Sequence, residues 1–72
     1  MSVAKVIEIS STSPSSFDDA VKQGIARAAK SVRNIQSAWV QDQRVTVKDN
    51  AVHEYQVNLK VTFLLDDNTP AG

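Results

Sequence analysis

The 72-residue chain contains no cysteine, a single histidine, and only two glycines and two prolines. Without thiols it cannot form a disulfide, and His53 alone cannot build a structural zinc site. A lone domain of this length buries too little apolar surface to be comfortably stable without a disulfide, a metal or partner subunits. Self-association is therefore the expected source of its stability.

The chain also lacks an excess of charge of either sign. Eight Lys and Arg residues balance eight Asp and Glu residues, so there is no basic footprint of the kind that binds nucleic acids or anionic membranes. The start, MSVAKVIEIS, has no signal-peptide core, and no segment approaches the length of a membrane span. We expect a cytoplasmic protein with no nucleic-acid or membrane partner.

Catalytic motifs are missing as well. No G-x-S-x-G motif or positioned base accompanies the serines between residues 11 and 16, so turns and helix caps explain them better than nucleophilic chemistry. His53 has no second histidine or cysteine nearby, which favours packing or an interface over a metal or catalytic role. Asp49-Asn50 and Asp66-Asp67-Asn68 are interpreted as a turn and a strand exit, with a weakly bound cation as the alternative. We therefore expect no enzyme and no metal site.

The order of predicted elements is strand, helix, strand, strand. Residues 3–9 alternate like a short strand, and SSTSPSS follows with two possible N-caps, Ser13 and Ser16. An amphipathic stripe from Phe17 to Val32 predicts a helix of about five turns that ends near Asn34. Residues 35–48 and 52–65 predict a hairpin around a turn at 49–51, whose Asn can adopt a left-handed conformation.

These elements predict one α+β domain over residues 1–72, with 66–72 as a flexible tail. Small residues in the helix stripe allow a sheet to approach the helix closely and wrap it. The hairpin strands are longer than the helix can cover, because a strand rises about 3.3 Å per residue and a helix about 1.5 Å. We expect the overhanging tip and the helix-free face of the sheet to contact neighbouring subunits.

The only tryptophan lies in the stretch SAWVQDQR, residues 37–44. Strict alternation places Ala38 and Val40 on one face. It places Ser37, Trp39, Gln41 and Gln43 on the other, polar face. In the last strand, His53 begins an apolar face that runs to Leu65, and the opposite face is polar and includes Gln56. The tryptophan is thus expected on the helix-free face.

The chain resembles the dodecins. The element order, the segments TSPSSFDDAV and IARAAKSVRNI around the helix, and EYQVNLKVTFLL as the last strand carry the similarity, which covers Val3 to Leu65. The resemblance implies a three-stranded antiparallel sheet that partly wraps one helix, and twelve copies in a hollow shell. It also implies flavins stacked in pairs at two-fold axes, between tryptophans of adjacent subunits, with a glutamine hydrogen-bonded to the ring.

The resemblance transfers unevenly to individual residues. Gln56 matches the flavin-bonding glutamine, and Arg44 falls where bacterial members commonly have an arginine near the ligand's polar end. Counting back from Gln56, the stacking tryptophan position falls on Ser37, and Trp39 lies two residues later, a shift of about 6–7 Å along the strand. Trp39 is interpreted either as a displaced ligand platform or as an interface anchor. Arg44 and Gln56 have alternatives in an ion pair with Asp42 or Glu54 and in a cross-strand hydrogen bond.

Two functional hypotheses follow. In the first, a homododecamer stores a flavin, either FMN, riboflavin or a related aromatic heterocycle, in two-fold clefts lined by Trp39, Gln56, Arg44, Ser37 and Gln41. In the second, a dodecin-like shell has a pocket that is closed, used for another small ligand or used for a cation, with no flavin cofactor. Ser37 is the residue that raises the second hypothesis. Both predict a particle on the order of 90 kDa, twelve times the 7.8 kDa chain mass, with high thermal stability.

Overall fold

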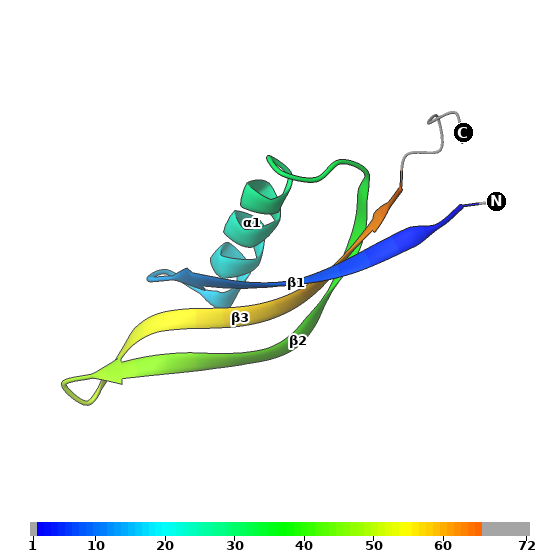
Figure 1. Ribbon diagram of the computed structural model, residues 1–72. Coiled ribbons are helices and arrows are strands. Elements are labelled where there is room, and N and C mark those ends of the chain that lie inside the picture. The colour runs from blue at the N-terminus through cyan, green and yellow to red at the C-terminus, as the bar shows by residue number, and fades with distance from the viewer. Residues whose placement is uncertain (1, 66–72) are drawn as a thin grey trace.

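The computed structural model describes residues 2–65 and has the predicted β-α-β-β order. Its elements are β1 (Ala4–Ser13), α1 (Phe17–Ala28), β2 (Ile35–Lys48) and β3 (Ala51–Leu64). The three strands form one antiparallel sheet in the order β1-β3-β2, so the last strand lies in the middle (Figure 1). The predicted α+β fold with a three-stranded antiparallel sheet is confirmed, whereas the predicted tail at 66–72 lies outside the described residues.

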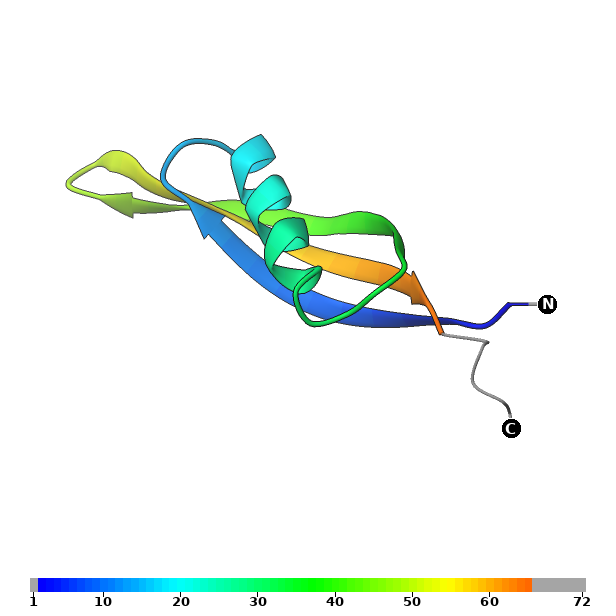
Figure 2. The same cartoon turned by 90° about the horizontal axis from the view of Figure 1, so that it is seen from above.

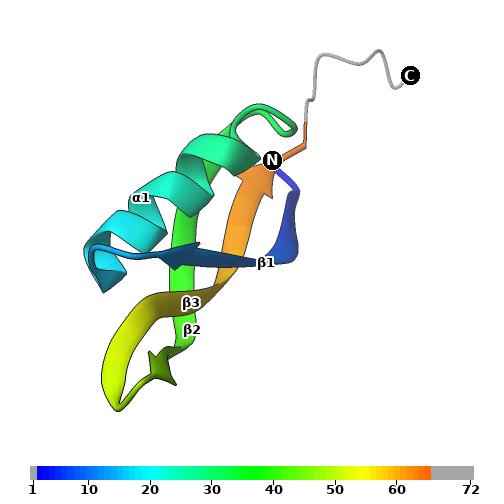
Figure 3. The ribbon, with the colours of Figure 1, turned by 90° about the vertical axis from the view of Figure 1, so that its left-hand side faces the viewer.

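The helix packs on one face of the sheet and buries a small core. Ala20 of α1 and Val57, Leu59 and Val61 of β3 are fully buried, and the rings of Phe17 and Tyr55 form a T-shaped pair with centroids 5.1 Å apart. Figure 2 shows α1 lying across the sheet while the hairpin tip extends past the helix. Figure 3, viewed from that tip, shows how strongly the sheet twists. The predicted overhang is therefore confirmed.

The first strand is longer than predicted. It continues beyond residue 9 to Ser13, because β3 provides a pairing partner for each additional residue, ending with Ser13 opposite Tyr55. Of residues 10–13 only Thr12 has a β-branched side chain that favours a strand, so the ladder to the central strand stabilises this extension. The first part of the stretch SSTSPSS, residues 10–13, is therefore part of the sheet and not of the predicted turn.

Of the two predicted helix starts, Ser16 is the N-cap and Ser13 is not. The hydroxyl of Ser16 accepts a hydrogen bond from the Asp19 backbone N–H at 2.9 Å. Ser13 is buried at the end of β1, where its hydroxyl donates to Asp19 Oδ2 at 2.6 Å and accepts from the Ser15 N–H at 2.9 Å. The two serines thus organise the same entry loop, and only Ser16 begins the helix.

The helix is shorter than predicted and ends at Ala28, with Ala29 as its C-cap. Val32 and Asn34 lie in the connection to β2, and Asn34 has a φ of 66°. The chain must turn early because the Asn34 carbonyl accepts a hydrogen bond from the Leu64 N–H at 3.0 Å, which anchors the entrance to β2. Within residues 2–65, no helix has the length and hydropathy needed to cross a membrane.

The hairpin turn forms where the sequence predicts it. β2 ends at Lys48 and β3 begins at Ala51, so the loop consists of Asp49 and Asn50, with φ of 54° and 63°. Two positive φ values match the twist of the flanking strands, and Asp and Asn tolerate this conformation better than most residues. The left-handed turn is confirmed.

Candidate functional site

On the helix-free face of the sheet the side chains form four rows. Each row contains one residue from each of the three strands. Val57, Leu59 and Val61 are buried toward the helix, so the alternate residues of β3 face the other way. Cross-strand pairing then places Val6–Thr62–Ser37, Glu8–Lys60–Trp39, Ser10–Asn58–Asp42 and Thr12–Gln56–Arg44 in successive rows. Except for Val6 and Trp39, these residues are polar, and no described helix covers them.

A β-bulge changes which residues of β2 reach this face. Val40 pairs with Leu59 and Asp42 pairs with Asn58, which leaves Gln41 as the extra residue of the bulge. The bulge reverses the alternation beyond it, so that Asp42 and Arg44 join the polar face and Gln43 lies opposite Val57 on the helix side. The prediction that Gln43 shares a face with Trp39 is therefore wrong, because strict alternation cannot include an inserted residue.

Gln41 borders a hollow beside this bulge. Glu8, Ile9, Ser10, Asp42 and Asn58 line the rest of the hollow, whose volume is about 270 Å³. Gln41 and Asp42 thus lie at the edge of the candidate site, between the row of Trp39 and the row of Arg44.

A chain of hydrogen bonds connects the side chains of the two rows nearest the hairpin tip. The Arg44 Nε–H donates to Gln56 Oε1 at 3.2 Å, and Gln56 Nε2 donates to Ser10 Oγ at 3.0 Å. Gln56 Nε2 also donates to Asn58 Oδ1 at 3.4 Å, and Asn58 Nδ2 donates to Asp42 Oδ1 at 2.5 Å. The cross-strand hydrogen bond predicted for Gln56 is present, and its partners come from all three strands.

Trp39 projects from the helix-free face and is 64% exposed. Its neighbour in the row is Lys60. The structure brings Arg44 and Gln56 together, but Trp39 lies two rows from them and Ser37 three rows. A tryptophan exposed to this degree in the single chain suits either a ligand platform or an interface anchor, so both interpretations stay open.

His53 is an unpaired residue in a second irregularity of the hairpin. Thr46 pairs with Glu54 and Val47 with Val52, so His53 between them has no partner in β2, and its side chain is exposed. The predicted continuous apolar face from His53 is interrupted there. Within residues 2–65, no three His, Cys, Asp or Glu side chains come together as a metal site would require.

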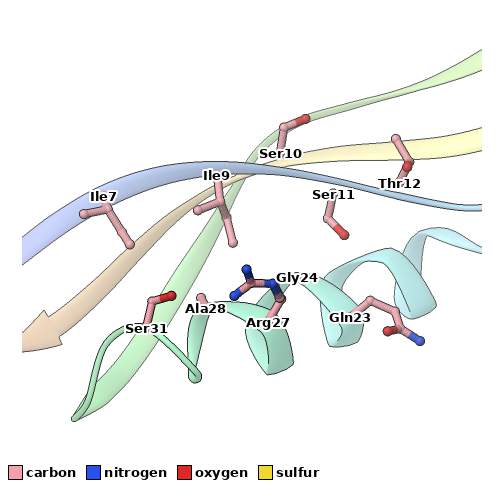
Figure 4. Close-up of a pocket in the computed structure, with 10 residues that line it drawn as sticks. All are labelled: Ile7, Ile9, Ser10, Ser11, Thr12, Gln23, Gly24, Arg27, Ala28 and Ser31. Carbon is pink, nitrogen blue, oxygen red and sulfur yellow. The ribbon is translucent and has the colours of Figure 1, made fainter.

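A larger concavity, which the sequence did not predict, lies between β1 and α1 and has a volume of about 570 Å³. Figure 4 shows Ile7 and Ile9 pointing from β1 toward the helix, whereas Ser10 points to the opposite side of the strand. Arg27 and Gln23 are its longest polar side chains, and both are exposed. The small residues Gly24 and Ala28 in the helix stripe are the sequence feature that allows α1 to approach β1 closely here.

Three comparisons place these features among known proteins. Residues 3–66 match the family model described as Dodecin. The calcium dodecin of Mycobacterium tuberculosis is 37% identical over 70 residues, covering 97% of this chain and 99% of that protein. The dodecin of Thermus thermophilus is 35% identical over 65 residues, covering 90% of this chain and 94% of that protein.

Solved structures agree with the sequence matches. The dodecin from Streptomyces davaonensis superposes with a TM-score of 0.89 at 33% identity, covering 92% of this chain and 97% of that one. The crystal structure of the calcium dodecin from M. tuberculosis, described as having a novel calcium-binding site, superposes with a TM-score of 0.79 at 35% identity, covering 94% and 97%. Both likenesses extend over nearly the whole chain.

Proposed function

Because the chain belongs to the dodecin family, we propose that it is a small binding and storage protein that holds a flavin or a related flat heterocycle in clefts between identical subunits. Dodecins form dodecamers of identical subunits, and the proposed assembly of this chain is likewise a closed shell of twelve. Flavin here means FMN or riboflavin. The proposal describes binding and storage and assigns no catalytic step.

The hydrogen-bonded pair of Arg44 and Gln56 on an uncovered sheet face is the observation that supports this function best. The amide of Gln56 lies beside a permanent cation, at a separation of 3.2 Å between Arg44 Nε and Gln56 Oε1. An amide can hydrogen-bond the edge of a heterocycle, and a guanidinium can bind an anionic or carbonyl group on the same ligand. These are the polar groups that a flavin edge and side chain require.

The site needs a second copy to become complete. One subunit offers the polar pair at one position and the exposed indole of Trp39 two rows away, so a ring bound at Gln56 has no aromatic neighbour in the same row. Across a two-fold axis, the partner subunit's Trp39 can stack on that ring. Burial between two copies would also exclude water from the hydrogen bonds and strengthen them.

A second candidate is a shell that does not bind flavin, and Ser37 favours it. Counting back from Gln56, as the resemblance implies, puts the stacking tryptophan position at Ser37, which is exposed and lies opposite Thr62. Two small hydroxyl side chains offer no surface for stacking. Such a shell would have a closed cleft, or a cleft for another small ligand or a cation, and the calcium dodecin relative makes calcium the cation to examine.

Flavin titration tests the proposed function. We expect the purified shell to quench the fluorescence of riboflavin or FMN at low micromolar protein, because stacking on an indole quenches the excited ring. Absence of quenching up to millimolar flavin would reject flavin storage and favour the second candidate. The Ser37→Trp variant separates the two further: a gain of binding that the parent lacks supports the flavin-independent shell.

A further inference from the structure

The hydrogen bonds on the helix-free face run in one direction. Starting from Arg44, each side chain donates a hydrogen bond to the next one. Arg44 Nε–H donates to Gln56 Oε1 at 3.2 Å, Gln56 Nε2–H to Asn58 Oδ1 at 3.4 Å, and Asn58 Nδ2–H to Asp42 Oδ1 at 2.5 Å. We call this series of four side chains the relay. It joins a cation to a carboxylate through two amides that have no charge of their own.

The two charged ends decide how the amides between them point. A guanidinium has only donors, and an ionised carboxylate has only acceptors. Turning the amide of Gln56 around would place its NH₂ group against the Arg44 N–H, and turning the amide of Asn58 around would place its carbonyl against the carboxylate of Asp42. Either change would lose the hydrogen bond at that end. Hydrogen bonds in such a series also polarise one another in the same sense. Asp42 therefore influences the orientation of Gln56 through Asn58, although no hydrogen bond joins Asp42 to Gln56 directly.

This orientation decides what Gln56 can offer to a ligand. Both of its amide hydrogens are engaged, one by Ser10 Oγ at 3.0 Å and one by Asn58 Oδ1 at 3.4 Å. Its Oε1 accepts one hydrogen bond, from Arg44, and a carbonyl oxygen has two lone pairs. The hydrogen-bonding site that Gln56 still has available for a ligand is thus an acceptor.

We propose that Asp42 and Asn58 are positioning residues that hold Gln56 as a hydrogen-bond acceptor, so that the cleft selects heterocycles with an N–H donor at the edge facing Gln56. Imide and lactam rings have such an edge, and their N-methylated forms do not. The inference rests on the proposed function for the existence of a ligand, and on the relay alone for the orientation of Gln56.

The test compares lumiflavin with 3-methyllumiflavin, which differ only in whether the imide nitrogen carries hydrogen or methyl. Fluorescence titration of the parent shell should show a preference of about tenfold or more for lumiflavin, the size expected when one hydrogen bond is lost and its partner stays unpaired. The Asp42→Asn variant replaces the acceptor-only end by an amide that also donates, so Asn58 can turn and Gln56 is then held in its orientation from the Arg44 end alone. Its preference should fall several-fold.

Asp49→Asn is the matched control, since it removes the same charge in the hairpin turn, outside the relay. It should keep the parent's preference. If Asp42→Asn leaves the ratio of the two affinities unchanged, or weakens both ligands equally, Asp42 does not position Gln56 and the proposal fails. A merely structural effect of Asp42 would change both affinities and not their ratio.

A second measurement decides the orientation of Gln56 without any ligand. Neutron diffraction from a perdeuterated crystal locates the amide deuterons, which should point from Gln56 to Ser10 and Asn58 in the parent. Deuterons directed into the open cleft would overturn the proposal even if lumiflavin binds. If lumiflavin does not bind but the deuterons lie as expected, the proposed flavin function fails and the relay stands.

Discussion

Val40 and Leu59 are partners across β2 and β3, yet Leu59 is fully buried while 49% of Val40 is exposed. The difference arises because α1 packs mainly on β1 and β3, leaving the helix side of β2 uncovered. Further along the hairpin, Val45, Val47 and Val52 are 37%, 63% and 52% exposed. Together with Val40 they form an apolar strip that residues 2–65 leave exposed, which is what a subunit interface requires.

Replacing Val47 with Asp should disrupt the assembly. Burying a carboxylate without a partner in a subunit contact is costly, so we expect the variant to give species much smaller than twelve chains in light scattering. The parent should scatter as a particle on the order of 90 kDa, from a chain mass of 7.8 kDa.

Ala26→Asp adds the same charge at an exposed position of α1, away from the hairpin, and it serves as the control. It should leave the particle mass unchanged. A parent protein that is a monodisperse monomer or dimer at micromolar concentration would contradict the assembly and, with it, the inter-subunit cleft.

Gly24→Ala should destabilise the protein, although alanine is the better helix former by about 1 kcal/mol. An added Cβ would lie 3.0 Å from Ser11 Cβ and 3.3 Å from Leu59 Cδ1. Ser11 Cβ is attached to the backbone of β1 and cannot rotate away, so the helix must move outward, at a net cost of about 1–3 kcal/mol. Denaturant unfolding measures the change.

Ala26→Gly, at an exposed position of the same helix, gives the pure propensity cost of about 1 kcal/mol for comparison. An increase in the unfolding midpoint of Gly24→Ala would show that the contact between helix and strand is looser than the structure indicates.

The hairpin turn should discriminate between glycine and alanine at position 50. Asn50 has a φ of 63°, a conformation that costs a residue with a Cβ about 1–2 kcal/mol unless its side chain compensates. We expect Asn50→Ala to lower the free energy of unfolding by about 1 kcal/mol, and Asn50→Gly to be neutral or slightly stabilising. Equal effects of both substitutions in denaturant unfolding would argue against the left-handed turn.

Of the serines in the entry loop, Ser16 caps the helix, so its replacement should lower the free energy of unfolding more than replacement of Ser15. Ser16→Ala removes the acceptor of the Asp19 N–H, which lies 2.9 Å away, and should cost about 1 kcal/mol. Ser15 is exposed and contributes its backbone N–H to this loop, as a donor to Ser13 Oγ, so Ser15→Ala should change the midpoint little. A larger loss from Ser15→Ala than from Ser16→Ala would contradict the assigned N-cap.

Local sequence patterns determined the order of the elements, the limits of β2 and the hairpin turn. A strand over residues 35–48 and a turn at the Asp-Asn pair depend on near neighbours in the chain, and the structure reproduces both. The buried side of β3, with Val57, Leu59 and Val61, follows from the same two-residue period. Family resemblance added Arg44 and Gln56, which the structure joins in a hydrogen bond.

Tertiary structure decided everything that depends on pairing between distant segments. β1 continues to Ser13 because β3 lies beside it, and α1 stops at Ala28 because the chain must reach the start of β2. The bulge at Gln41 moves Asp42 and Arg44 onto the face of Asn58 and Gln56 and turns Gln43 away. A periodic sequence pattern cannot predict where a residue is inserted into a strand, and the hydrogen bond between residues 42 and 58 depends on the register of the two strands. Only the folded sheet could therefore assemble the relay.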